Sequence, residues 1–167
     1  MTCGIAGAGK STLSKAIVAS LPSFTRLSGD TINREVHGLY KIDYPPDKHE
    51  ENLDRSQVIV KERLHNILAE GQRDVVLDLS FWNKKYRDEY KSLIERGGGR
   101  WVLVFLDAQR ELLWSRIGQR AAARDAVSAL EERDGDSAFD IDTETFDMYC
   151  SGFERPNGEG EIVIKVV

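Results

Sequence analysis

The sequence predicts an α/β fold with a parallel β-sheet of about five strands. Short apolar runs alternate along the chain with stretches in which apolar residues recur at helical spacing, and this alternation is typical of βαβ units. Residues 74–78, DVVLD, have a continuous apolar centre, as expected for a strand that is buried on both faces. With 167 residues, the chain has the length of one domain, and we expect residues 1–167 to form it.

The first helix and strand follow a glycine-rich segment. Residues 13–21 place apolar side chains at helical spacing, and Pro22 ends the predicted helix. Residues 24–27 predict a short strand that ends just before Asp30. In open α/β sheets, ligands bind at the carboxyl ends of the strands. Asp30 is therefore placed at a candidate site.

A long helix is predicted between the loop over residues 38–46 and the strand over residues 74–78. Asp47, with Glu50 three residues later, forms a capping-box-like start for this helix. A glycine ends it. The strand that follows carries Asp78 as its last residue, so a second carboxylate falls at a strand end.

The second half of the chain continues the alternation. Its predicted elements are, in order, a helix ending at the glycines 97–99, a strand over 100–106, a helix over 109–124, a helix over 142–152 and a strand over 161–167. A polar, acidic stretch separates the last two helices. Such a stretch is typical of a mobile helical lid, which we place at about residues 118–140.

The strongest signal is a glycine-rich motif next to the first helix. Residues 4–11, GIAGAGKS, satisfy the P-loop pattern G-x-x-x-x-G-K-[ST] and lead into the helix that the motif requires. Glycines let backbone N–H groups approach phosphate oxygens at the positive end of a helix dipole. The motif predicts a P-loop NTPase fold, a nucleotide-kinase-like three-layer sandwich. The residues predicted to bind the nucleotide are Gly4, Ala6, Gly7, Ala8, Gly9, Lys10, Ser11 and Thr12.

Two side chains of the motif have distinct predicted roles. Lys10 is expected to neutralise the β- and γ-phosphates during catalysis, and the Ser11 hydroxyl is expected to be a ligand of Mg²⁺. ATP and Mg²⁺ are therefore the predicted cofactors. Only residues 1–3 precede Gly4, so the strand that presents the loop is expected to be shorter than the usual length of about five or six residues.

The two aspartates at strand ends, Asp30 and Asp78, are candidates for the remaining chemistry. A phosphoryl-transfer site needs a base or orienting group for the acceptor and a carboxylate that holds magnesium and its water. We assign the first role to Asp30 and the second to Asp78. Each residue has an alternative: Asp30 caps the following turn, or Asp78 forms hydrogen bonds in the strand-to-helix loop.

Four segments carry a family resemblance over nearly the whole chain. They are residues 3–12 (CGIAGAGKST), 27–33 (LSGDTIN), 75–78 (VVLD) and 152–156 (GFERP), of which the first is the most specific. They resemble the small P-loop kinases of the zeta-toxin, chloramphenicol phosphotransferase and polynucleotide 5′-kinase type, a group that includes AAA-like ATP-binding proteins. The resemblance implies that Asp30 contacts the acceptor hydroxyl. It also implies an arginine three residues later, where this sequence has Asn33, with Arg34 one place on.

Three arginines spaced four residues apart share one face of the helix that leads into the predicted lid. They are Arg116, Arg120 and Arg124. The resemblance implies that arginines here clamp the phosphates, and phosphoryl transfer needs such groups to stabilise charge. We assign Arg120 and Arg124 to catalysis and Arg116 to nucleotide binding. The alternative is a solvated charged face, which is common on helices.

Aromatic residues fall in or beside loops at the same predicted sheet edge. They are Tyr40, Tyr44, Phe81 and Trp82. Their rings are suited to stacking on an aromatic or sugar acceptor. The alternative, that they belong to the hydrophobic core, is the favoured interpretation.

The function that these features predict is an ATP-dependent phosphotransferase. It would move the γ-phosphoryl group of Mg-ATP to a hydroxyl of a small molecule or of a polynucleotide 5′-end. The alternative is a non-catalytic or regulatory ATP-binding module, because a P-loop alone does not distinguish the two. The sequence does not favour a GTPase, because the nearest match to the N-K-x-D motif, residues 83–86 (NKKY), lacks the aspartate.

Composition limits the partners and the compartment. The net charge of −5 argues against a broad basic surface, so extended nucleic acid is not an expected partner, whereas a short 5′-end stays open. The apolar run over residues 101–106 is far shorter than a membrane span. Cys3 and Cys150 match no metal-ligand spacing. We expect a cytoplasmic protein without a membrane partner, and the sequence does not define its oligomeric state.

Overall fold

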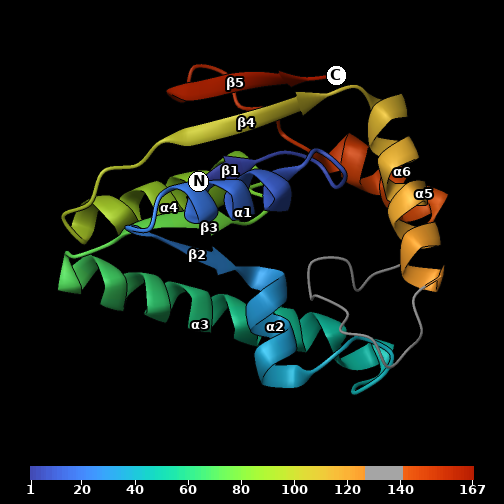
Figure 1. Ribbon diagram of the computed structural model, residues 1–167, viewed down its shortest axis with the longest axis horizontal. Coiled ribbons are helices and arrows are strands. Elements are labelled where there is room, and N and C mark those ends of the chain that lie inside the picture. Colours follow the sequence, from blue (N-terminus) through green and yellow to red (C-terminus); the bar gives the residue numbers. More distant parts are fainter. Residues whose placement is uncertain (127–140) are drawn as a thin grey trace.

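The computed structural model describes residues 1–126 and 141–167, without the side chains of residues 124–126. Its centre is one five-stranded sheet in the order β2-β3-β1-β4-β5, in which every neighbouring pair is parallel (Figure 1). The strands are β1 (Thr2–Cys3), β2 (Phe24–Ser28), β3 (Asp74–Asp78), β4 (Leu103–Ala108) and β5 (Glu161–Val166). The predicted α/β fold with a parallel sheet of this size is confirmed.

Helices flank the sheet and connect its strands. They are α1 (Lys10–Ser20), α2 (Gly29–His37), α3 (His49–Glu70), α4 (Lys84–Arg96), α5 (Arg110–Ala126) and α6 (Thr143–Gly152), with a 3₁₀ turn, η1 (Pro46–Lys48), before α3. Of the predicted lid, residues 118–126 belong to the end of α5 and residues 127–140 lie outside the described part of the chain. None of the described helices has the length and apolar character needed to cross a bilayer.

The central strand, β1, is two residues long, which confirms the expected short strand. It is paired on both sides: Thr2 is in register with Asp78 of β3 and Val104 of β4, and Cys3 with Phe105. Its side chains add contacts, since Thr2 Oγ1 donates to the Leu77 carbonyl at 3.1 Å. Its neighbours therefore hold β1 in place.

Two hydrophobic clusters form the core among the described residues. The larger one packs Val60 and Leu64 of α3 and Tyr90 of α4 against strand residues such as Leu77. The smaller one packs Leu106 of β4 against α5 and α6. Helices α3 and α4 therefore share one cluster, and α5 and α6 share the other.

Three element boundaries differ from the predictions. Helix α3 begins at His49, after a 3₁₀ turn, and its N-cap residue makes no side-chain hydrogen bond; the capping box predicted at Asp47 is wrong, because the prolines start a tighter turn there. The strand predicted over 100–106 is β4, Leu103–Ala108, because its pairing with β5 runs to Ala108. Helix α2 was not predicted at all.

Candidate nucleotide-binding site

The P-loop connects the short β1 to α1 and depends on glycine at Gly7. Its φ of 85° lies in the left-handed region, and a Cβ there would stand 2.8 Å from the Leu113 carbonyl oxygen of α5. Gly9, the N-cap of α1, has a φ of 97°, and a Cβ there would meet no atom within 4 Å. The backbone is thus tightly packed at Gly7 and borders open space at Gly9. Since Gly9 precedes the N-terminus of α1, the open space lies where a helix N-terminus is suited to bind phosphate.

Lys10 begins α1 and folds back over the loop. Its Nζ donates to the carbonyls of Gly4 at 2.8 Å and Ile5 at 3.1 Å. Burial lowers the pKa of Lys10, and the negative charges of Asp78 and Asp30 act in the opposite direction. Both carboxylates predicted for the site therefore lie near this ammonium group.

Asp78 forms an ion pair that the sequence did not predict. Arg26 of β2 donates to Asp78 Oδ2 from Nε at 2.9 Å and from Nη2 at 2.5 Å. The side chains are 15% and 3% exposed, respectively. Both contacts use Oδ2, so Oδ1 lies outside this pair. Arg26 Nη1 also contacts Thr31 Oγ1 at 3.4 Å, which links β3 to the first turn of α2.

Asp30 is an exposed residue in the first turn of α2. The capping role considered for it belongs to Ser28, whose Oγ accepts from the Thr31 N–H at 3.3 Å. The charge of Asp30 also acts on Tyr149 of α6, where burial and then Asp30 raise the pKa of the phenol. The charge of Asp30 therefore acts on both the P-loop lysine and a phenol of α6.

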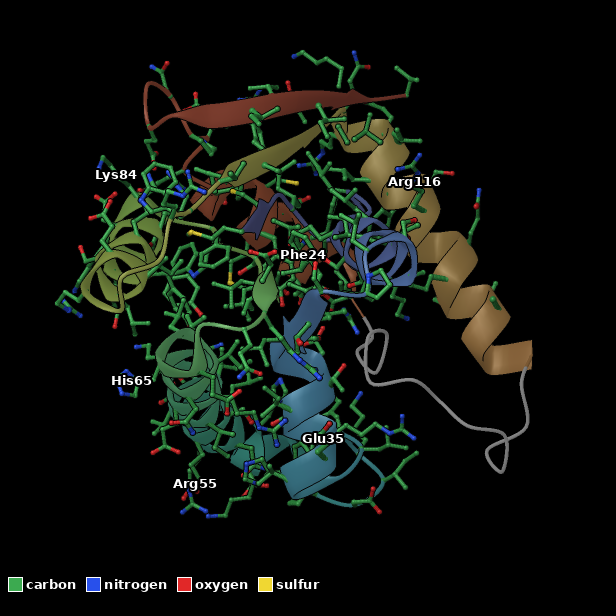
Figure 2. The ribbon with its side chains drawn as sticks, turned by 60° about the vertical axis from the view of Figure 1, so that its left-hand side comes forward. Phe24, Glu35, Arg55, His65, Lys84 and Arg116 are labelled. Atoms are coloured by element: carbon green, nitrogen blue, oxygen red, sulfur yellow. The ribbon has the colours of Figure 1, made fainter. Side chains whose placement is uncertain are left out.

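Arg116 and Arg120 of α5 have different partners. The positive charge of Arg120 contributes to lowering the pKa of Lys10, so Arg120 acts on the P-loop. Arg116 Nη2 instead donates to the Val167 carbonyl at 3.4 Å, and Figure 2 shows Arg116 well apart from Glu35 of α2. The Arg124 side chain lies outside the described residues.

The aromatic candidates divide between core and surface. Phe81 is fully buried and packs against Tyr86 and Tyr90, with ring centroids 5.4 and 5.2 Å away. Tyr44 is 8% exposed and accepts a hydrogen bond from Asn33 Nδ2 at 2.7 Å. Trp82 is 50% exposed. The core interpretation holds for Phe81 and Tyr44, and only Trp82 offers a largely open ring.

A second feature that the sequence did not reveal is the anchoring of the loop between β3 and α4. Arg87 Nη1 donates to the carbonyls of Phe81 at 2.9 Å and Glu154 at 2.8 Å. The Glu154 N–H donates to the Trp82 carbonyl at 2.8 Å. The P-loop meets the same loop, since the Gly4 N–H donates to the Ser80 carbonyl at 3.3 Å. The segment around Glu154 thus fixes a loop beside the candidate site.

The residues present fit a magnesium ion that comes with a nucleotide. Among the described side chains, those of residues 1–123 and 141–167, no three acidic, histidine or cysteine groups gather as a protein-only metal site. Mg²⁺ usually keeps several waters and takes one or two protein ligands plus phosphate oxygens. Ser11 at the start of α1 and Asp78 at the end of β3 are a hydroxyl and a carboxylate of the kind that such an ion takes.

Comparisons with known proteins show the family and the fold of this chain. A family model described as an AAA domain matches residues 1–156. A search of curated protein sequences finds no match.

Similar solved structures share the fold. A candidate kinase from Chloroflexus aurantiacus is similar with a TM-score of 0.72 and 18% identity, over 98% of this chain and 85% of that chain. APS kinase CysC from Mycobacterium tuberculosis, in complex with AMPPNP and APS, has a TM-score of 0.58 and 17% identity, over 98% of this chain and 85% of that chain. Kti12 from Chaetomium thermophilum, in complex with ADP-AlF3, has a TM-score of 0.65 and 14% identity, over 98% of this chain and 87% of that chain. At these identities, the similarity establishes the fold alone.

Proposed function

Since this chain belongs to the AAA domain family and carries a complete P-loop, we propose that it transfers the γ-phosphoryl group of Mg-ATP to a hydroxyl group. The observation that carries the proposal is that Asp78 ends β3 in register with Thr2 of β1 and Ser28 of β2, so that the P-loop after β1 and Asp30 after β2 lie at the same edge of the sheet as Asp78. The charges of both carboxylates also act on the pKa of Lys10. Phosphoryl transfer needs these groups together: a cation on the phosphates, a carboxylate toward magnesium and a carboxylate toward the acceptor.

In the proposed reaction, the oxygen of the acceptor hydroxyl forms a bond to the γ-phosphorus. Asp30 accepts the proton that this hydroxyl loses. The bond from that phosphorus to the β–γ bridging oxygen breaks, and ADP leaves. Lys10 and Arg120 offset the negative charge on the phosphates. Ser11 and Asp78 would hold Mg²⁺, which would supply further positive charge to offset that of the phosphates. Asp30 suits the role of a base for the acceptor hydroxyl, because it is exposed in the first turn of α2 and its charge acts on Lys10.

Some observations favour the second candidate, an ATP-binding module without transfer activity. Asp78 is engaged by Arg26, and Asn33, at the position where an acceptor-side arginine is expected, is 5% exposed and tied to Tyr44. Neither observation removes the carboxylate at Asp30. The net charge of −5 favours a small acceptor over a long polynucleotide.

The test is transfer of label from γ-labelled Mg-ATP. The wild-type protein is incubated with a pool of cell metabolites or with a 5′-hydroxyl oligonucleotide, beside Lys10→Ala and Asp30→Ala. Glu35→Ala is the matched control, because Glu35 lies near the far end of the same helix as Asp30 and pairs with Arg63 (Figure 2).

We expect a labelled product that both site variants abolish and that Glu35→Ala leaves unchanged. ATP binding without any labelled acceptor would favour the non-catalytic module.

A further inference from the structure

A residue that no motif assigns adds to the charges around the P-loop. The charges of Asp30, Asp78 and Arg120 act on Lys10, and Arg26 contacts Asp78 at 2.5 to 2.9 Å. With Arg26, the cations of this group outnumber its two carboxylates by one. Without Arg26, the cations and the carboxylates are equal in number. Arg26 thus provides the excess of positive charge in this group.

The position of Arg26 makes its charge effective. The Asp78 side chain is 3% exposed and that of Arg26 is 15% exposed, so water screens this pair much less than a surface pair. Arg26 also contacts Thr31 Oγ1 at 3.4 Å, which holds the guanidinium between β3 and the first turn of α2. A lysine here would keep the charge and lose the two-nitrogen contact with Asp78.

We propose that Arg26 is a built-in counter-charge for Asp78 that allows this site to bind nucleotide without magnesium as well as with it. The inference rests on nucleotide binding at the P-loop and is independent of phosphoryl transfer. A free nucleotide is more negative than its magnesium complex by the charge of the ion. An unpaired Asp78 would therefore repel the free nucleotide more strongly, whereas bound magnesium would neutralise the same carboxylate.

The experiment measures the dissociation constant of a non-hydrolysable ATP analogue by calorimetry, with excess Mg²⁺ and with EDTA. In Arg26→Met, we expect affinity to fall about tenfold or more in EDTA and less in Mg²⁺. Arg26→Lys is expected to stay near the wild-type ratio, because it keeps the charge.

Arg73→Met is the matched control. Arg73 is exposed, precedes β3 and contacts Thr25 of β2 at 3.5 Å, so this variant removes the same charge at the opposite end of the same strand pair. We expect it to leave both affinities unchanged.

An equal loss with and without Mg²⁺ in Arg26→Met would overturn the proposal, because a purely structural role predicts it. A larger loss with Mg²⁺ would also overturn it and would make Arg26 a positioning residue for the metal ligand. If wild-type protein binds no nucleotide, the proposed function fails as well.

If Arg26→Met does not fold, Arg26→Met/Asp78→Asn removes the pair as a unit and keeps the net charge of the site. Its affinity in EDTA is then expected to match the wild type, and a tenfold loss would contradict the proposal.

Discussion

Arg87 of α4 and Glu159 form a buried ion pair across 72 residues of sequence, with Nε 2.9 Å from Oε2. Their side chains are 1% and 5% exposed, and Lys91 adds a contact to Glu159 at 3.1 Å. Because Arg87 also donates to the Phe81 carbonyl, the pair links the last part of the chain to the loop beside the P-loop.

Removing Arg87 should destabilise the protein strongly. Arg87→Met leaves the Glu159 carboxylate buried without its main partner, and breaking a buried pair in this way costs about 3–5 kcal/mol. Urea denaturation measures the loss. Arg63→Met breaks the exposed pair between Arg63 and Glu35 and should cost at most about 1 kcal/mol. Equal losses for the two variants would contradict the structural role of the buried pair.

The same pair should make stability depend on pH in acid. Hydrogen bonds from Arg87 and Lys91 lower the pKa of Glu159 to about 2, below its value of about 4.3 in an unfolded chain. The folded state therefore binds a proton at Glu159 less readily than the unfolded chain does. The stabilisation by the ionised Glu159 is complete above the pKa of the unfolded chain and is lost as the pH falls toward the pKa of the folded state. The stability difference between wild type and Glu159→Gln should shrink between about pH 4.5 and 2. A difference that is constant with pH would argue against the shift.

Replacing Gly7 or Gly118 with alanine should change the stability of the protein in opposite directions. Gly7→Ala places a Cβ 2.8 Å from the Leu113 carbonyl at a φ of 85°, so the P-loop or α5 must move, at a cost of about 1–3 kcal/mol. Gly118→Ala adds a Cβ in open space within α5 and should stabilise by about 0.5–1 kcal/mol. Melting temperature and nucleotide affinity are measured together. Retained affinity in Gly7→Ala would show that the loop tolerates the shift.

Placing an arginine at position 33, where the sequence resemblance implies one, should not improve the site. Asn33 is 5% exposed; its Nδ2 donates to Tyr44 and its Oδ1 accepts from Ser56 Oγ at 3.1 Å. Asn33→Arg removes both bonds and adds bulk, so we expect at least about 2 kcal/mol of destabilisation and no gain in label transfer. Val36→Arg, at a position that is 47% exposed, is the control and should leave stability nearly unchanged. Increased transfer by Asn33→Arg would contradict this account.

The fold was predictable because its signals are local. The P-loop pattern requires a strand before it and a helix after it, and the apolar run of β3 indicates burial on both faces. Helix α2 was missed because the prediction stopped the strand near Asp30 and took no account of Ser28 as an N-cap with Ile32 on the buried side. The start of α3 was misplaced because Pro46 favours a turn over the predicted cap.

The site was less predictable because its main contacts are long-range. Arg26 is a single charged residue in a short strand, and its partner Asp78 comes 52 residues later. That register exists only once β2 and β3 pair, with Ser28 opposite Asp78. The other residues of β2 are Phe24, Thr25, Leu27 and Ser28, so Arg26 is the charged residue of this strand, and no motif distinguishes it. For Arg87 and Glu159, no spacing rule connects the two positions.

The two-residue β1 also constrains the order in which the protein acquires its binding site. Thr2 meets its partner Leu77 across 75 residues, and β1 is held on the other side by β4, Leu103–Ala108. Contacts between such distant segments form late and slowly. During synthesis, β1 can therefore be paired on both sides only after β4 has left the ribosome.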